Sequence, residues 1–211
     1  MSSSDTVAII LAAGKGTRMK SAMPKVLHSV GGLPMLGHAM RGAAQADISH
    51  TIIVISPEQD SVEAFAKDFS ADVSISIQNK QNGTGDAVKA AMPLAKTVKR
   101  AVIMFGDTPL MRAETLKQLA QAEAQVSVLG FTPANPDGYG RILLSDEHTP
   151  VEIIEHKDAN EEFRQKPSAS AHPKRIEILT RFRRVGVVVA GLHVRAIVAA
   201  VPDVVLVRVH F

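Results

Sequence analysis

A glycine-rich segment follows the first apolar run of the chain and reads Leu11-Ala12-Ala13-Gly14-Lys15-Gly16-Thr17-Arg18-Met19. Small residues let backbone N–H groups approach an anion closely. Lys15, Arg18 and Lys25 supply positive charge at the same place. The segment therefore predicts a loop that binds a triphosphate, beyond the carboxyl end of a strand.

The spacing of the loop excludes two common nucleotide motifs. A P-loop needs glycine, four residues and then Gly-Lys-Ser/Thr, which this segment lacks. A dinucleotide fingerprint would use Gly14 and Gly16 as its first two glycines, but Met19 stands where its third belongs. From spacing alone, a structural turn without a ligand remains the alternative.

A polar segment after another apolar run reads Gln78-Asn79-Lys80-Gln81-Asn82-Gly83-Thr84-Gly85. An amide such as that of Gln78 can pair with the acceptor–donor edge of uracil, and Gly83-Thr84 offers backbone and hydroxyl groups. The alternative is a polar turn in which Thr84 caps the following helix.

A carboxylate closes a further apolar run, in Phe105-Gly106-Asp107-Thr108-Pro109-Leu110. A carboxylate beside phosphates suits Mg²⁺, which prefers oxygen ligands and keeps several waters. Asp107 is therefore the candidate metal ligand. A Gly-Asp turn with no ligand is the alternative, because such turns are common after strands.

Alternating apolar segments predict the scaffold that positions these residues. The βαβα order indicates an α/β, Rossmann-like fold with a mostly parallel sheet and helices on both faces, plus a small β-rich lobe. After Gln165 the sequence predicts no regular element. The expected strands are residues 7–11, 51–55, 73–77, 100–105 and 126–131, the helices 34–45, 59–69, 86–95 and 113–124, and the lobe strands 141–144 and 151–155.

Composition narrows the possible functions of the 211 residues. Seven Phe, one Tyr and no Trp argue against the base-stacking surface of a single-stranded nucleic-acid binder. The absence of cysteine excludes disulfides and thiolate metal sites, and no two histidines lie four residues apart as in a helix-borne zinc site. Neither a signal peptide nor a membrane span is apparent, so we expect a cytoplasmic location.

The motifs together resemble the N-acetylglucosamine-1-phosphate uridyltransferases. The glycine-rich loop, extended by Lys20-Ser21 and followed by Pro24-Lys25-Val26-Leu27-His28, is similar to the signature of that family. The Gln78 and Asp107 segments also resemble it, as do Gly138-Tyr139-Gly140-Arg141-Ile142 and Val151-Glu152-Ile153-Ile154-Glu155-His156-Lys157-Asp158-Ala159. These last two segments alone also fit a surface β-arm. The four matches occur in the family's order over residues 7–158.

The resemblance implies that UTP and N-acetylglucosamine 1-phosphate react to give UDP-N-acetylglucosamine and pyrophosphate, with Mg²⁺ as cofactor, in the synthesis of bacterial cell-envelope precursors. It assigns Arg18 and Lys25 to catalysis and Asp107 to the metal. The implied nucleotide contacts are Leu11, Ala12, Ala13, Gly14, Lys25, Gln78, Gly83 and Thr84, and the implied sugar contacts are Gly106, Gly140 and Glu155. A cytidylyl- or guanylyltransferase of the same fold, or a UTP-binding module without turnover, remains the alternative.

The C-terminal part departs from the family pattern. The family has a later asparagine that completes the metal site, whereas Asn160 is the last asparagine here. We therefore expect a uridyltransferase domain over residues 1–165 and a divergent tail over 166–211. Full-length relatives add an acetyltransferase domain of hexapeptide repeats, through which they trimerise; no such repeat is found here. That chemistry and that trimer are therefore not expected from these residues, and the oligomeric state is left open.

Overall fold

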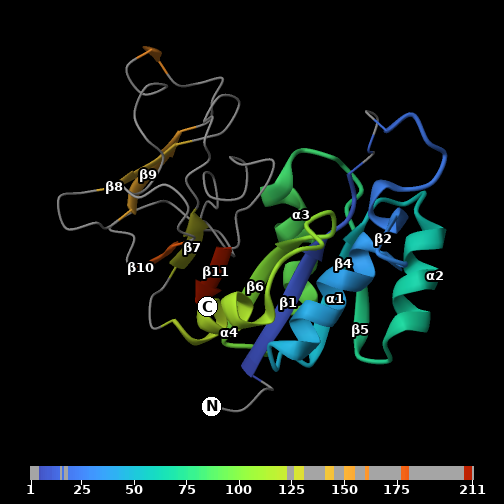
Figure 1. The fold of residues 1–211 in the computed structure, drawn as a ribbon, viewed down its shortest axis with the longest axis horizontal. Coiled ribbons are helices and arrows are strands. Elements are labelled where there is room, and N and C mark those ends of the chain that lie inside the picture. The colour runs from blue at the N-terminus through green and yellow to red at the C-terminus, as the bar shows by residue number, and fades with distance from the viewer. Residues whose placement is uncertain are drawn as a thin grey trace.

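The computed structural model describes residues 5–14, 16, 19–122, 126–130, 141–144, 150–154, 160–161, 177–180 and 207–210, and the fold is presented for these residues (Figure 1). Its centre is a seven-stranded sheet with the order β10-β7-β11-β6-β1-β4-β5. The strands are β1 (Thr6–Leu11), β4 (His50–Ile55), β5 (Val73–Ile77), β6 (Arg100–Phe105), β7 (Val126–Gly130), β10 (Glu177–Thr180) and β11 (Val207–His210).

The centre of the sheet is parallel, as predicted. β1 pairs in parallel with β4 on one side and with β6 on the other, and β4 pairs in parallel with β5. Val7 to Ile10 have no exposed surface. A parallel strand covered on both faces needs such a continuous apolar run, which explains why β1 does not alternate polar and apolar residues.

Helices cover both faces of the sheet, which confirms the predicted fold class. In Figure 1, α1 (Met35–Gln45) and α4 (Ala113–Gln121) lie in front of the sheet, and α3 (Thr84–Ala91) lies behind it. α2 (Asp60–Phe69) packs beside α1 and shares its core. The front core is built from the apolar faces of these helices, with Leu36, Met40, Val62, Leu116 and Leu119 buried against β1, β4 and β6.

Helix boundaries agree with the predicted ones or differ from them by up to four residues. α3 begins at Thr84 rather than residue 86, because Gly83, with φ of +102°, forms the N-cap. Thr84 is thus the first helical residue and not a cap, so that alternative is wrong. α3 continues into a short 3-10 helix, η4 (Met92–Leu94). α4 ends at Gln121 because Ala122 leaves the helical region, with ψ of 137°.

A small hairpin connects the first loop to α1. It consists of β2 (Ser29–Val30) and β3 (Leu33–Pro34) and follows a 3-10 helix, η3 (Lys25–Leu27). The turn Gly31-Gly32 has φ of +58° and +83°, the left-handed angles that a two-residue hairpin turn requires. The hairpin and η3 therefore determine the position of Lys25, the residue at which the first loop ends.

The later strands both confirm and correct the sequence prediction. β8 (Arg141–Leu144) and β9 (Pro150–Ile154) form a separate antiparallel pair with an irregularity at Leu143/Leu144, as the β-rich lobe requires. The expectation of no regular element after Gln165 is wrong for two short strands. β10 pairs with β7, and β11 pairs with both β6 and β7, all antiparallel. Both strands pair with partners distant in the sequence, and no local pattern marks such pairings.

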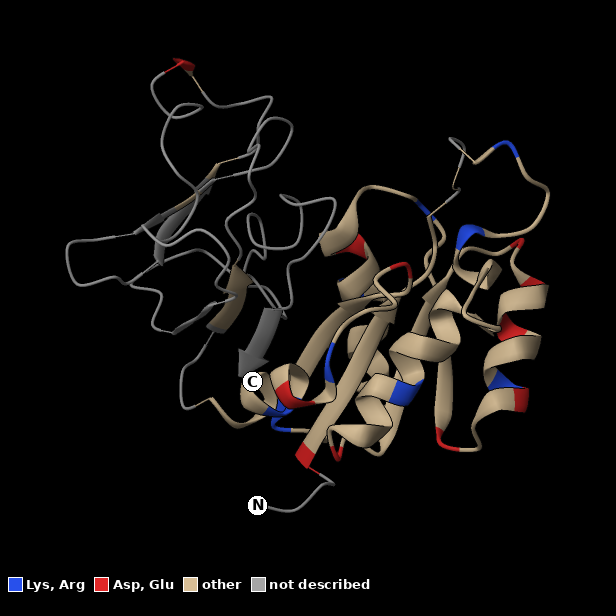
Figure 2. Ribbon diagram, in the orientation of Figure 1, with Lys and Arg blue, Asp and Glu red and all other residues tan. Residues whose placement is uncertain are grey.

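The surface of the described residues carries mixed charge. Acidic and basic positions are interspersed over the helices and loops (Figure 2). Within the part of the chain that the structure describes, no helix is long and apolar enough to cross a bilayer.

Candidate functional site

A cavity of about 490 Å³ lies beyond the carboxyl ends of β1, β5 and β6. This is where ligands bind in open parallel sheets, because the strand-to-helix loops gather there. Its walls come from the glycine-rich loop, the segment around η3, the polar segment after β5 and the end of β6. The lining residues are Leu11, Ala12, Ala13, Gly14, Gly16, Met19, Lys25, Val26, Gln78, Gln81, Gly83, Thr84, Ala87, Phe105 and Asp107.

Two glutamine side chains hold the backbone of the glycine-rich loop. Gln59 Nε2 donates to the carbonyl of Ala12 at 3.1 Å, and Gln81 Nε2 donates to that of Ala13 at 3.0 Å. The described residues offer no acceptor to the N–H groups of Ala13 and Gly14. With the carbonyls of Ala12 and Ala13 engaged and no acceptor for these N–H groups among the described residues, the loop is suited to an anionic ligand.

Gln59 is a functional residue that sequence reasoning missed. It is buried, with 8% of its surface exposed, and lies just before α2. Its Oε1 also accepts from the N–H of Ser56 at 2.8 Å. One amide therefore ties the loop after β4 to the loop after β1. The only sequence signal was a glutamine at the start of a helix, which is usually exposed.

Gly16 marks a close crossing between the loop and the start of η3. Its φ is +57°, and a Cβ built there would lie 2.8 Å from Lys25 Cβ. Its carbonyl accepts from the N–H of Met19 at 2.9 Å. Both the backbone angle and the contact favour glycine. This crossing brings Lys25 to the cavity wall.

Lys25 and Asp107 form an ion pair across the cavity, with Nζ 2.7 Å from Oδ2. Their side chains are 41% and 26% exposed, so both groups are accessible to a ligand. Asp107 follows β6 after Gly106, whose N–H donates to the carbonyl of Leu11 at 2.9 Å. The pair joins two residues 82 positions apart, one at the start of η3 and the other just after β6.

The polar segment after β5 forms the opposite wall. Gln78 is 4% exposed, and its Nε2 donates to the carbonyl of Gly83 at 3.0 Å and to Asp86 Oδ2 at 3.1 Å. Its backbone N–H donates to the carbonyl of Ile55 at 2.8 Å. Sequence reasoning singled out Gln78 but did not identify Asp86 as its partner. Gln78 and Asp86 are eight residues apart across a loop, and this spacing carries no sequence signal for the contact.

The structure brings most predicted site residues together on one cavity. Gly106 does not line it: the residue is buried, and a Cβ there would lie 3.1 Å from a methyl group of Val26. Arg18, Gly140 and Glu155 lie outside the described residues, as does Lys15. The predicted residues that do line the cavity are Leu11, Ala12, Ala13, Gly14, Lys25, Gln78, Gly83, Thr84 and Asp107.

The donor set of the cavity suits Mg²⁺ better than a transition metal. Among the described residues, no three His, Cys, Asp or Glu side chains cluster as a closed metal site would need. Among the described residues that line the cavity, Asp107 supplies the one carboxylate, and its side chain is accessible. Mg²⁺ is commonly held by one or two carboxylates together with substrate phosphates and water. Asp107 therefore fits a nucleotide-bound Mg²⁺.

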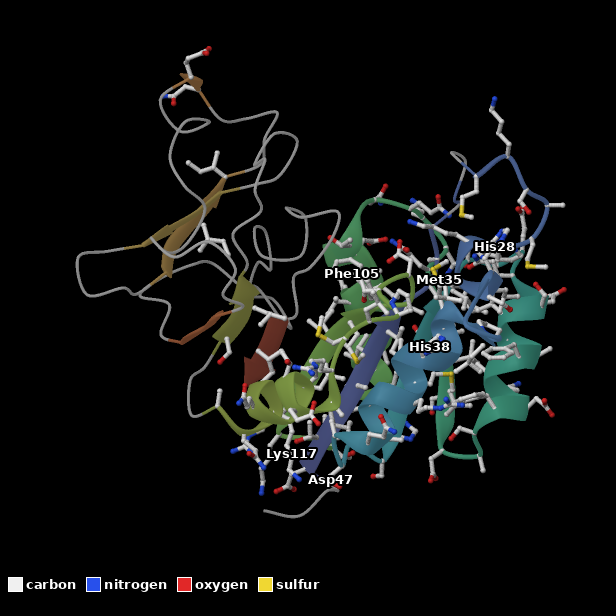
Figure 3. The ribbon with its side chains drawn as sticks, in the orientation of Figure 1. His28, Met35, His38, Asp47, Phe105 and Lys117 are labelled. Atoms are coloured by element: carbon white, nitrogen blue, oxygen red, sulfur yellow. The ribbon has the colours of Figure 1, made fainter. Side chains whose placement is uncertain are left out.

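The polar side chains that line the cavity lie at one end of the sheet. Figure 3 shows Phe105 near Met35, at the end where β6 and β1 finish. The exposed pair of Lys117 with Asp47 lies at the opposite end (Figure 3). Neither Lys117 nor Asp47 lines the cavity.

Comparison with known proteins agrees with the fold. Residues 8–172 match the MobA-like NTP transferase domain. The chain is 47% identical over 162 residues to the bifunctional protein GlmU of Parvibaculum lavamentivorans, covering 75% of this chain and 36% of that protein. It is 42% identical over 167 residues to GlmU of Corynebacterium aurimucosum, covering 75% and 34%. The chain thus spans about a third of the length of these relatives.

Among solved structures, a putative glucose-1-phosphate thymidylyltransferase from Bacillus anthracis superimposes with a TM-score of 0.65. The two are 22% identical, and the match covers 83% of this chain and 71% of the other. At this identity the likeness concerns the fold alone.

Proposed function

The chain belongs to the family of MobA-like NTP transferase domains, a nucleotidyltransferase family, and from this premise we propose that it transfers the uridylyl group of UTP to N-acetylglucosamine 1-phosphate. The observation that carries the proposal is the single cavity on which nine of the predicted residues converge. The identity to GlmU proteins, 47% and 42%, supports this choice of substrates within the family. UDP-N-acetylglucosamine and pyrophosphate are the products.

The nucleotide is proposed to span the cavity from Gln78 to the glycine-rich loop. Gln78, Gly83 and Thr84 would contact the base, since the amide and backbone groups match the edge of uracil. The N–H groups of Ala13 and Gly14 and the ammonium of Lys25 would contact the phosphates. Arg18 is proposed to act on the same phosphates by its place in the motif.

The reaction itself needs no general base, because a phosphate monoester is already an anionic nucleophile. One of its oxygens forms a bond to the α-phosphorus of UTP, and the bond from that phosphorus to the β-bridging oxygen breaks. Pyrophosphate leaves with the electron pair. The contribution of the protein is to position the reactants and to neutralise the developing charge. Lys25 can turn from Asp107 to a phosphate oxygen without leaving the cavity wall.

Asp107 is proposed to hold a Mg²⁺ ion together with the triphosphate. The ion would supply positive charge beside the phosphates. Gly140 and Glu155 are proposed to contact the amino sugar, with β8 and β9 belonging to the sugar-binding lobe. Gly106 is proposed to serve the sugar only indirectly, through the position of Asp107. We place the reaction in the cytoplasm, where nucleoside triphosphates are made.

The experiment that tests the proposal measures pyrophosphate release by the purified chain with UTP, N-acetylglucosamine 1-phosphate and Mg²⁺. We expect release that depends on the sugar phosphate and that stops when EDTA is added. Hydrolysis of UTP without the sugar phosphate is the control. A chain that binds UTP but releases no pyrophosphate would refute turnover.

The binding-module alternative predicts that the chain binds UTP in this assay without releasing pyrophosphate. The cytidylyl- and guanylyltransferase alternatives are tested by replacing UTP with CTP or GTP in the same assay. The Gln78→Ala variant should lose preference for UTP over CTP. An unchanged preference would remove Gln78 from the base contact.

A further inference from the structure

We propose that Asp86 is a specificity-determining residue, which fixes the amide of Gln78 so that its carbonyl oxygen alone faces the base. This inference rests on the proposed function, because it concerns how the nucleotide is chosen. Asp86 does not line the cavity among the described residues. It is therefore a positioning residue, which acts on the base through Gln78.

The partners of the Gln78 amide determine its orientation. Its nitrogen lies 3.0 Å from the carbonyl oxygen of Gly83 and 3.1 Å from Asp86 Oδ2. Both partners are acceptors, and an ionised carboxylate has no hydrogen to donate. If the amide were reversed, its oxygen would face two acceptors with no hydrogen between them. These two acceptors therefore require the amide nitrogen, and not the amide oxygen, to face Gly83 and Asp86.

The amide oxygen is the group left for the cavity. Both hydrogens of Nε2 are engaged, one by Gly83 and one by Asp86. Within the described part of the chain, Gln78 Oε1 accepts no hydrogen bond. It is also not one of the fully buried side-chain atoms that lack a partner, so the oxygen is accessible. Since Gln78 lines the cavity, the oxygen is placed to accept a hydrogen bond from a ligand.

A fixed acceptor distinguishes the two pyrimidines. Uracil has an N–H at ring position 3 that can donate to the amide oxygen, whereas cytosine has an unprotonated nitrogen at that position. The oxygen of Gln78 would meet the lone pair of that nitrogen and be repelled. A freely turning amide would instead present its nitrogen to cytosine and accept both bases. The restraint from Asp86 thus favours UTP over CTP.

A matched set of variants tests this role. Asp86→Ala removes the acceptor. Asp86→Asn keeps an acceptor, its own amide oxygen, and should retain the preference for UTP over CTP. Asp86→Ser is the second test if the alanine variant fails to fold, because its hydroxyl is too short to hold the Gln78 amide. Asp60→Ala is the control, since Asp60 is also an acid in the first turn of a helix but lies in α2, away from the cavity.

Binding of UTP and of CTP, each with Mg²⁺, is measured separately by titration calorimetry on the full chain. We expect the wild-type chain to favour UTP, and the ratio of the two affinities to fall about tenfold in Asp86→Ala, the size expected for losing one hydrogen bond to a charged group. Part of the fall should be a gain in CTP affinity. Asp86→Asn and Asp60→Ala should keep the wild-type ratio.

Each other outcome overturns the inference in a recognisable way. An unchanged ratio in Asp86→Ala, or an equal loss for both nucleotides, would mean that Asp86 only supports the fold. Equal affinities in the wild-type chain would mean that no selection exists for Asp86 to support. A wild-type chain that binds neither nucleotide would refute the proposed function itself.

Discussion

The crossing of the glycine-rich loop over Lys25 gives a measurable prediction for Gly16→Ala. An alanine at φ of +57° costs about 1–2 kcal/mol of backbone strain relative to glycine. Its Cβ would lie 2.8 Å from Lys25 Cβ, where backbone and side-chain shifts of an overpacked site add about 1–3 kcal/mol. We expect a total loss of about 3 kcal/mol in the free energy of unfolding. For a chain of this size, that lowers Tm by roughly 6–12 °C.

Alanine substitutions at two other glycines separate the cost of backbone strain from the cost of the steric contact. Gly31 has φ of +58° and nothing within 4 Å of a built Cβ, so Gly31→Ala carries the strain alone, about 1.5 kcal/mol. Gly14 has open space and no left-handed angle, so Gly14→Ala should change the stability by less than about 0.5 kcal/mol. The difference between Gly16→Ala and Gly31→Ala is then the steric cost of the crossing.

Urea denaturation followed by circular dichroism measures all three variants, and a UTP titration accompanies it. Gly16→Ala should also bind UTP more weakly, because the displaced Lys25 lies on the cavity wall. A Gly16→Ala chain as stable as Gly31→Ala would refute the close crossing. Weakened UTP binding without a stability loss would mean that the loop changes shape without contacting Lys25.

Three further predictions concern the supports of the cavity. Gln59→Ala should lower the free energy of unfolding by about 2–4 kcal/mol, because the carbonyl of Ala12 and the N–H of Ser56 both lose their partner; urea denaturation measures this, and wild-type stability would contradict it. Gln81→Ala should cost less than about 1 kcal/mol, since this residue is exposed, yet weaken UTP binding by about three- to tenfold in a nucleotide titration; unchanged affinity would show that the Ala13 carbonyl needs no restraint. Asp107→Ala should abolish pyrophosphate release while changing the stability by less than about 1 kcal/mol, because its pair with Lys25 is partly solvated; an active variant would refute the metal assignment.

Sequence patterns were sufficient for the central fold because its strands are long apolar runs. The continuous apolar run at β1 and the β-branched run at β4 are typical of strands buried on both faces, and both strands were predicted. The predicted start of α3 was two residues later than its actual start at Thr84. A glycine with a positive φ ends the preceding turn without any side-chain cap, so no capping pattern marked it.

Most of the described residues that the sequence predicted for the site line the cavity, whereas the residues that support them were not predicted. Gln78 and Asp107 stand at the ends of strands, where a parallel sheet gathers its loops, and their types alone suggested a role. Gln59 and Asp86 act on backbone or amide groups from neighbouring elements. Their partners are set by three-dimensional packing, and nothing in the local sequence identifies them.

The position of β11 has a consequence for the order in which the chain can fold. Among the described strands, β7 is joined to β6 only through β11, which comes last in the sequence. During synthesis on a ribosome, the four strands from β5 to β6 can assemble early, because their pairings need only residues up to Phe105. β7 must wait for Val207–His210 to emerge, and until then β6 is an open edge able to pair with another chain. Aggregation of nascent or truncated chains should therefore begin at β6.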